Sequence, residues 1–236
     1  RPMQVFVPEI RTARVPAAFR RRAAACCLLL LLLAASAGSA SEAETILSGM
    51  QQRYAAAGTI SGSFRLTYRD FGIEQAEWGV FRLAKPARMR WEYAHPKGKL
   101  FVADGKESFL YVPEDNQVTV QSFTAVEMEN TPLRFLLGSE DFAGSFFITS
   151  ESASEARFEG SQVVRLTPKG GEPGFSWLLL EIDRNTRDLL RLVMREHSGN
   201  TLEYVFSDMQ ADVAVSDKEF KFTIPPGAEV LRMVAE

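Results

Sequence analysis

The chain has 236 residues, of which 24% are charged, and its formal net charge is −3. Six of the 27 Lys/Arg but only one of the 30 Asp/Glu lie in residues 1–40, which leaves 21 against 29 and a net charge of −8 for residues 41–236. This acidic balance argues against nucleic-acid binding and against tight docking on an anionic membrane, and it favours a freely diffusing monomer.

Residues 1–40 have the organisation of a secretory signal peptide. Arg20, Arg21 and Arg22 precede an apolar run over 23–35, and small residues follow up to Ala40. The apolar run is shorter than the roughly 20 residues that a transmembrane helix needs. We therefore expect cleavage near Ala40, a periplasmic location, and one domain over 41–236. The chain does not begin with Met, and Met3 or a later codon is the expected start.

Both cysteines, Cys26 and Cys27, lie inside this predicted signal peptide. The mature chain would then have no cysteine. It could form no disulfide, and it would offer neither a thiol nucleophile nor a thiolate ligand for a metal.

The first predicted element of the mature chain is an amphipathic helix of about four turns. Ser41 and Glu44 form a capping-box pattern, and the helix should end near Gly58. Its apolar face consists of Ile46, Leu47, Met50 and Tyr54.

From residue 60 to residue 121 the pattern becomes that of short strands. Met89 and Trp91 alternate with charged residues, and Asp104-Gly105 is a strong hairpin signal. A sheet with so many large apolar side chains on one face must cover that face. The candidate acyl-binding residues on this inner face are Phe64, Leu66, Phe81, Leu83, Met89, Trp91, Phe109 and Tyr111.

Short apolar helices should interrupt the strands between residues 124 and 142. Residues 125–129 indicate one helix, and Thr131-Pro132 indicates the start of another that ends at Gly138. We expect the leucines of this insert, Leu133, Leu136 and Leu137, to form a lid over the sheet.

Strands then resume to the end of the chain. They are expected over 146–150, 161–167, 176–183, 189–196, 201–207 and 219–224. The fold class is therefore mainly β (α+β). We predict an unclosed antiparallel β-barrel or half-barrel of about ten or eleven strands with a lid of about three short helices.

Residue types that carry catalysis are sparse. His95 and His197 fall in turns without nearby metal ligands, and no P-loop, Gly-x-Ser-x-Gly or Gly-x-Gly-x-x-Gly motif occurs. Residues 41–236 instead contain 15 Phe, three Trp and six Met. We expect a protein that binds apolar material, with no enzymatic activity, no metal and no cofactor. Met89 beside Trp91 would pack adaptably against variable acyl chains.

A set of short motifs in a fixed order resembles the LolA family of periplasmic outer-membrane lipoprotein carriers. These motifs run over nearly the whole mature chain. They are Gly79-Val80-Phe81-Arg82-Leu83 with Lys85-Pro86, Met89-Arg90-Trp91, Val102-Ala103-Asp104-Gly105-Lys106, Tyr111-Val112-Pro113 with Gln117-Val118-Thr119, Asn130-Thr131-Pro132-Leu133, Leu166-Thr167-Pro168-Lys169 and Phe220-Lys221-Phe222-Thr223-Ile224-Pro225-Pro226-Gly227.

The resemblance implies a carrier that accepts triacylated lipoproteins from an inner-membrane ABC transporter and delivers them to an outer-membrane receptor, where one is present. It also implies that Lys85 is a lid latch. The family has an arginine at that position, hydrogen-bonded to backbone carbonyls of the lid, and lysine lacks its planar fork.

Other functions remain open on the sequence. The alternative reading is another periplasmic lipid or glycolipid shuttle, or a lipoprotein-sensing module of the same fold. Less favoured are an outer-membrane receptor, which would need an N-terminal lipidated cysteine, and a hydrolase, for which no nucleophile–base pair is evident.

Overall fold

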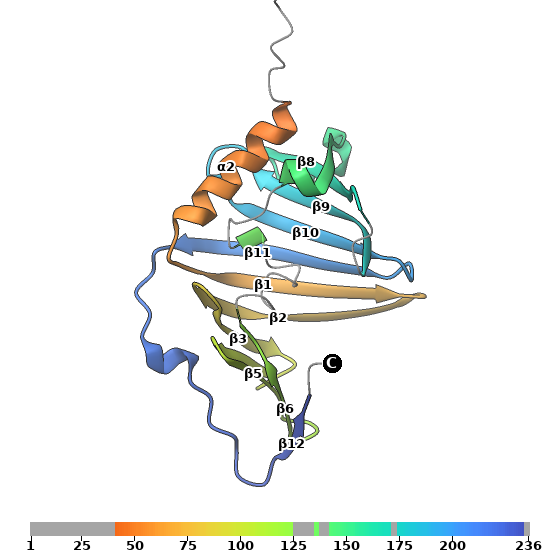
Figure 1. Cartoon of the computed structure of the whole chain (residues 1–236). Helices are drawn as coiled ribbons and strands as arrows, with labels where there is room; N and C mark the ends of the chain where they lie inside the picture. Colours follow the sequence, from red (N-terminus) through yellow and green to blue (C-terminus); the bar gives the residue numbers. More distant parts are fainter. Residues whose placement is uncertain (1–40, 125–134, 137–141, 171–173, 234–236) are drawn as a thin grey trace, which may run out of the picture. The chain divides into compact units, whose positions relative to one another are not determined.

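The structure is a computed structural model that describes residues 41–124, 135–136, 142–170 and 174–233. Its main element is one sheet of twelve strands in the order β12-β6-β5-β4-β3-β2-β1-β11-β10-β9-β8-β7 (Figure 1). The strands are β1 (Thr59–Asp70), β2 (Ile73–Ala84), β3 (Arg88–His95), β4 (Leu100–Asp104), β5 (Glu107–Val112), β6 (Gln117–Ser122), β7 (Phe146–Ser150), β8 (Ser161–Pro168), β9 (Phe175–Asp183), β10 (Leu189–Glu196), β11 (Thr201–Ala211) and β12 (Glu229–Arg232).

The sheet is open, because β12 and β7 stand at its two ends and do not pair with each other. Neighbouring strands are antiparallel, except that β12 runs parallel to β6. This confirms the predicted mainly β, unclosed antiparallel fold, with twelve strands in place of ten or eleven. The described helices are α2 (Glu42–Ala56), α4 (Phe142–Ser145) and the 3-10 turns η3 (Ala153–Glu155) and η4 (Asp217–Phe220). The predicted helix over 125–129 lies outside the described residues.

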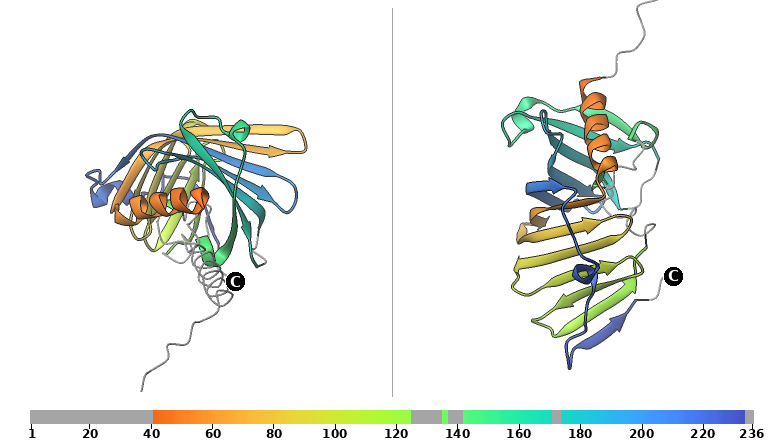
Figure 2. Two further views of the ribbon diagram at one scale, coloured as in Figure 1. Left: turned by 90° about the horizontal axis from the view of Figure 1, so that it is seen from above. Right: turned by 90° about the vertical axis from the view of Figure 1, so that its left-hand side faces the viewer.

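Helix α2 begins as its capping box predicts. The backbone N–H of Ser41 donates to the Glu44 carboxylate at 2.7 Å, and the N–H of Glu44 donates to the Ser41 hydroxyl at 3.2 Å. The helix contacts β7, β8 and β9, and Figure 2 shows it on the concave side of the curved sheet. We call the sheet face that α2 covers the inner face. The helix buries Ala43, Ile46, Leu47, Met50 and Tyr54.

The inner face carries the main core. Cross-strand pairing sets Phe81 opposite Trp91 between β2 and β3, and Phe64 opposite Phe206 between β1 and β11. Each large side chain buried in this way stabilises the fold by about 1.5–3 kcal/mol. Buried members of the core from the strands include Ile60, Phe64, Phe81, Leu83, Met89, Trp91, Leu178, Leu180, Ile182, Leu192 and Phe206.

The C-terminal segment covers the opposite, outer face of β3–β6. After η4 the chain crosses this face, where the ring of Phe222 stacks on that of Phe109 with centroids 5.4 Å apart, and then adds β12 to the edge of β6. The strand predicted over 219–224 is therefore wrong: Phe220 ends η4, and residues 221–228 belong to no strand. Their apolar side chains alternate as in a strand, but they pack across the sheet and have no ladder partner.

The loop between β7 and β8 covers the outer face of β9–β11. It rests on Glu181, which is fully buried. One Glu181 carboxylate oxygen accepts hydrogen bonds from the backbone N–H groups of Arg157 and Phe158, both at 2.8 Å, and from the Ser161 hydroxyl at 2.7 Å. The other oxygen accepts from Arg191 Nε at 2.7 Å. The buried charge is thus fully paired, as a buried carboxylate must be to persist.

Candidate binding site on the inner face

Six of the eight predicted acyl-binding residues share the inner face. Phe64, Phe81, Leu83, Met89 and Trp91 are each at most 4% exposed, and Leu66 is partly exposed on the same face. Trp91 joins the strands: its ring lies 4.5 Å from that of Phe64 and 4.9 Å from that of Phe81. The structure thus gathers these side chains from β1, β2 and β3 into one apolar surface.

Phe109 and Tyr111 do not belong to this surface. Pairing of β4 with β5 sets Val102 opposite Phe109, and Val102 in turn faces Arg90 on β3, so this row lies on the outer face. Both rings instead contact Phe222 of the C-terminal segment. The inner-face positions of β4 and β5 are Phe101 and Leu110. The sequence gives three consecutive apolar residues at 109–111, so period two cannot decide which of them points inward.

Part of the predicted lid is described. Leu136 is completely buried in the inner-face core together with Phe135, and the Phe135 ring stacks on that of Phe142 at 5.5 Å. These residues therefore form part of the cover of the inner face. The other two predicted lid residues, Leu133 and Leu137, lie outside the described residues.

Lys85 contacts backbone carbonyls, as the predicted latch would, and the carbonyls belong to α2. Its Nζ donates to the carbonyl oxygens of Tyr54 at 2.6 Å and Ala55 at 3.1 Å, in the last turn of the helix. These carbonyls have no partner within a helix, and the helix dipole favours a cation there. Burial lowers the pKa of the Lys85 amine, and the nearby Asp212 carboxylate opposes that shift.

Two further polar contacts hold α2 to the sheet near this end. Arg53 Nε donates to the Asp188 carboxylate at 2.7 Å, and the buried Tyr54 hydroxyl accepts from the backbone N–H of Leu189 at 2.9 Å. Burial raises the pKa of Tyr54, so its hydroxyl stays protonated at neutral pH.

Exposure rises along the inner face toward the turn between β1 and β2. Phe81 and Met89 are 1% exposed, Leu66 and Tyr93 are partly exposed, and Ile73 beside the turn is 61% exposed. Figure 1 shows this turn at the end of β1 opposite to the end where α2 joins the sheet. The inner face is therefore closed at the α2–β1 junction and opens toward the β1–β2 turn.

Four polar residues that the sequence did not single out lie at the open end, and we call them the polar rim. Lys99 Nζ donates to both carboxylate oxygens of Glu77, at 2.6 and 2.8 Å, and lies 4.6 Å from the centre of the Tyr93 ring. Tyr204 completes the group, because Leu66 on β1 faces Glu77 on one side and Tyr204 on the other. The rim consists of Glu77, Tyr93, Lys99 and Tyr204.

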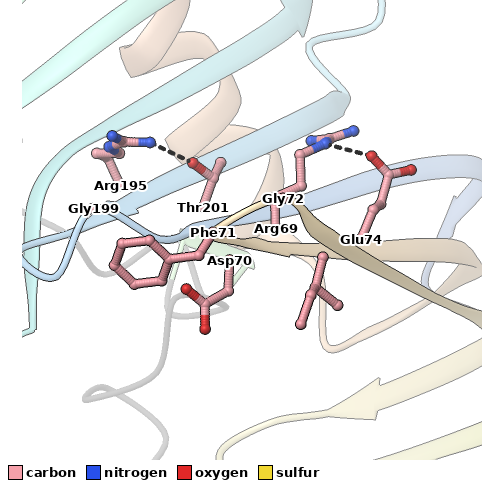
Figure 3. A pocket seen from close by; sticks show the side chains of 9 residues that line it. Arg69, Asp70, Phe71, Gly72, Glu74, Arg195, Gly199 and Thr201 are labelled. Carbon is pink, nitrogen blue, oxygen red and sulfur yellow. Dashed lines mark hydrogen bonds and ion pairs between the residues drawn. The ribbon is translucent and has the colours of Figure 1, made fainter.

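A shallow pocket of about 320 Å³ lies at the tips of the β1–β2 and β10–β11 turns. Arg69 Nε pairs with the Glu74 carboxylate at 2.8 Å, and Arg195 donates to the Thr201 hydroxyl at 3.0 Å (Figure 3). Asp70, which also lines the pocket, has one buried carboxylate oxygen, Oδ1, without a hydrogen-bond partner in the described part of the chain. Phe71 at its edge is 93% exposed. None of the predicted acyl-binding residues lines this pocket.

The histidines form no site. The His95 ring stacks on Trp78 at 4.4 Å, and His197 Nδ1 lies 3.1 Å from the Ser176 hydroxyl. Within the described residues, no group of three or more His, Cys, Asp or Glu side chains could hold a metal ion. In the same part of the chain, no helix is long and apolar enough to cross a membrane.

The architecture is an open, almost entirely antiparallel sheet with an apolar inner face, which α2 covers over β7–β9 and which Phe135 and Leu136 also cover. The family model described as "Outer membrane lipoprotein carrier protein LolA" matches residues 56–223. The chain belongs to this family, which confirms the resemblance seen in its sequence motifs.

Similar proteins include several named outer-membrane lipoprotein carrier protein. The one from Dechloromonas aromatica is 32% identical over 157 residues, which cover 66% of this chain and 72% of the relative. The one from Neisseria gonorrhoeae is 27% identical over 192 residues, or 81% of this chain and 89% of the relative. Among solved structures, an uncharacterized conserved protein from Thermus thermophilus has the same fold, with a TM-score of 0.51 and 13% identity over 80% of this chain and 98% of that one.

Proposed function

We propose that this protein is a soluble periplasmic carrier of acylated lipoproteins. It accepts them from an inner-membrane ABC transporter, holds their acyl chains against the inner face, and delivers them to the outer membrane, through a receptor where one is present. Membership of the LolA family and the names of the relatives support this role. The predicted signal peptide over 1–40 is consistent with a periplasmic location. The role involves no catalytic step and no cofactor.

The continuous apolar inner face is the observation that carries this proposal. Phe64, Met89 and Trp91 are buried on it, and α2, Phe135 and Leu136 cover it. Neither α2 nor the pair Phe135 and Leu136 belongs to a strand of the sheet. They can therefore move without breaking the ladder of backbone hydrogen bonds.

The energetics require a cover that competes with the ligand. Burial stabilises an acyl chain by about 0.8 kcal/mol per CH₂, so a chain of about 16 carbons would gain on the order of 10 kcal/mol. Binding of that strength would prevent delivery. If the acyl chain must displace Phe135 and Leu136 from the core, the loss of their packing offsets part of the free energy gained by burying the acyl chain. The lipoprotein can then be released.

Lys85 and Leu136 have distinct roles in this proposal. Leu136 is the part of the lid that the ligand displaces, and the predicted lid residues Leu133 and Leu137 would act with it. Lys85 is the latch that holds the last turn of α2 against the sheet, through its bonds to the Tyr54 and Ala55 carbonyls. A lysine fulfils this task with two of its three donors.

Native mass spectrometry of the protein purified from the periplasm tests the proposal. We expect complexes whose extra mass equals that of an intact triacylated lipoprotein, and the complexes should dissociate when a detergent replaces the acyl chains. Co-purification of glycolipid or phospholipid alone would identify another lipid shuttle. Absence of any bound amphiphile, also after co-expression with an abundant lipoprotein, would contradict the proposal.

A further inference from the structure

The polar rim stands where an amphiphile bound on the inner face would change from apolar to polar. Along β1–β3 the inner face is apolar and buried at Phe81 and Met89, and it becomes polar and partly exposed at Tyr93 and Glu77. Both zones belong to the same face, because Tyr93 follows Trp91 at the next inward position of β3. A ligand with its tail at Trp91 would therefore place its polar end within reach of the rim.

The hydroxyl groups of Tyr93 and Tyr204 are available to such a ligand. In the described part of the chain, neither hydroxyl has a hydrogen-bond partner. Tyr68, on the same inner face, instead accepts from Asn200 at 2.8 Å. Burial raises the pKa of both rim tyrosines, that of Tyr204 to about 12, and the neighbouring Glu77 carboxylate adds to the shift. Both hydroxyls therefore remain O–H donors at physiological pH.

The charges of the rim restrict the chemistry of the polar group. Lys99 is already neutralised by Glu77, through two hydrogen bonds of 2.6 and 2.8 Å. A phosphate group would be repelled by the Glu77 carboxylate, and the rim offers it no unpaired cation. An uncharged polar group that accepts hydrogen bonds meets no such repulsion, and ester carbonyl oxygens fit this description.

We propose that the polar rim binds the ester-bearing glyceryl group of an acylated cysteine, with the Tyr93 and Tyr204 hydroxyls donating to its ester carbonyl oxygens. This inference rests on the proposed carrier function and deepens it. The inner face holds the hydrocarbon tails, and the rim recognises the group that joins the tails to the polypeptide. The lipoprotein itself then leaves the inner face beside the β1–β2 turn.

The test compares two lipopeptides that differ only in these carbonyls. One is a synthetic tripalmitoylated Cys-Ser-Lys₄ peptide, and the other carries alkyl ethers in place of its two glyceryl esters. The exported wild-type protein should bind the ester peptide about tenfold more tightly than the ether peptide, as expected for two neutral hydrogen bonds. The double variant Tyr93→Phe/Tyr204→Phe should bind both peptides with the wild-type affinity for the ether peptide.

The matched control is Tyr111→Phe, on the outer face, which should retain the tenfold preference. Thermal unfolding monitored by circular dichroism shows whether the double variant is folded. The inference is overturned if the folded double variant keeps the preference, if its affinity for both peptides falls equally, or if the wild-type protein binds phosphatidylglycerol more tightly than the ester peptide. A wild-type protein that binds neither lipopeptide would contradict the proposed function itself.

Discussion

Lys85 shows how a single side chain can set how firmly α2 is held. Its amine donates to two carbonyl oxygens in the last turn of α2, just before the chain continues into β1. A backbone hydrogen bond reinforces the same corner, since the N–H of Lys85 donates to the carbonyl of Gly58 at 3.1 Å. The helix is thus attached at the end that continues into the sheet.

We predict that Lys85→Met lowers the free energy of unfolding by about 1–2 kcal/mol, because it removes a charged donor from two helix-terminal carbonyls and keeps the apolar stem. Urea denaturation measures the change. Lys85→Arg is the control, since its guanidinium can serve the same carbonyls, and it should stay close to wild type. An unchanged urea midpoint for the methionine variant would show that the hydrogen bonds of Lys85 to α2 do not stabilise the fold.

At the scale of elements, the β7–β8 loop depends on one buried carboxylate. Burial by itself would raise the pKa of Glu181, but the hydrogen bonds from Ser161, Phe158, Arg191 and Arg157 together lower it below its ordinary value of 4.5. Arg191 also donates to the carbonyl oxygen of Glu155 at 2.7 Å and so fixes η3. The loop, the carboxylate and β10 form one polar unit on the outer face.

This unit predicts a sensitivity to acid. Because the pKa of Glu181 is lower in the folded protein than in the unfolded chain, its stabilising effect is complete above about pH 4.5 and is lost as the pH falls through the folded value. Urea denaturation between about pH 3 and 7 should therefore show a steeper loss of stability on the acid side for wild type than for Glu181→Gln.

The glutamine variant should also be about 3 kcal/mol less stable at neutral pH, because the buried Arg191 loses its carboxylate partner at 2.7 Å and keeps the more distant Glu203 carboxylate, at 3.8 Å. Glu74→Gln is the control: the Glu74 side chain is 57% exposed, and its loss should leave the wild-type pH profile intact. Parallel pH profiles for wild type and Glu181→Gln would refute this role of Glu181.

How well the sequence predicts each strand depends on whether apolar and polar residues alternate clearly enough to show which side chains point to the inner face. Met89 and Trp91 alternate with Arg88, Arg90 and Glu92, so their inward direction could be predicted. Residues 109–111 are all apolar, and their direction depends on the register of the β4–β5 hairpin. The pairing of Glu77 with Lys99 joins residues 22 positions apart, and a register shift at Trp78/Gly79 helps to place it. No local pattern reveals such a contact.

At the scale of the whole molecule, the described sheet is covered on both faces by different means. The inner face is covered by α2 and by Phe135 and Leu136, whereas parts of the outer face are covered by the C-terminal segment and the β7–β8 loop. The segments on the outer face are held by the sheet itself. The C-terminal segment adds β12 to the edge of β6, and the β7–β8 loop is hydrogen-bonded to the buried Glu181. We therefore place the displaceable cover, and the acyl chains, on the inner face only.

The three tryptophans report on the two faces separately. Trp91 is 4% exposed in the inner-face core. Trp78 is 40% exposed on the outer face beside Arg65, and Trp177 packs on the outer face under the Arg165 guanidinium at 4.3 Å. Three variants that each keep one tryptophan, with phenylalanine at the other two positions, would separate their signals.

Fluorescence quenching by a triacylated peptide with brominated acyl chains tests the central claim most directly, because bromine quenches only tryptophans that it contacts. The protein that keeps Trp91 should lose most of its emission on binding, and the proteins that keep Trp78 or Trp177 should lose little. Equal quenching at all three positions, or binding that leaves Trp91 unquenched, would contradict acyl-chain binding on the inner face.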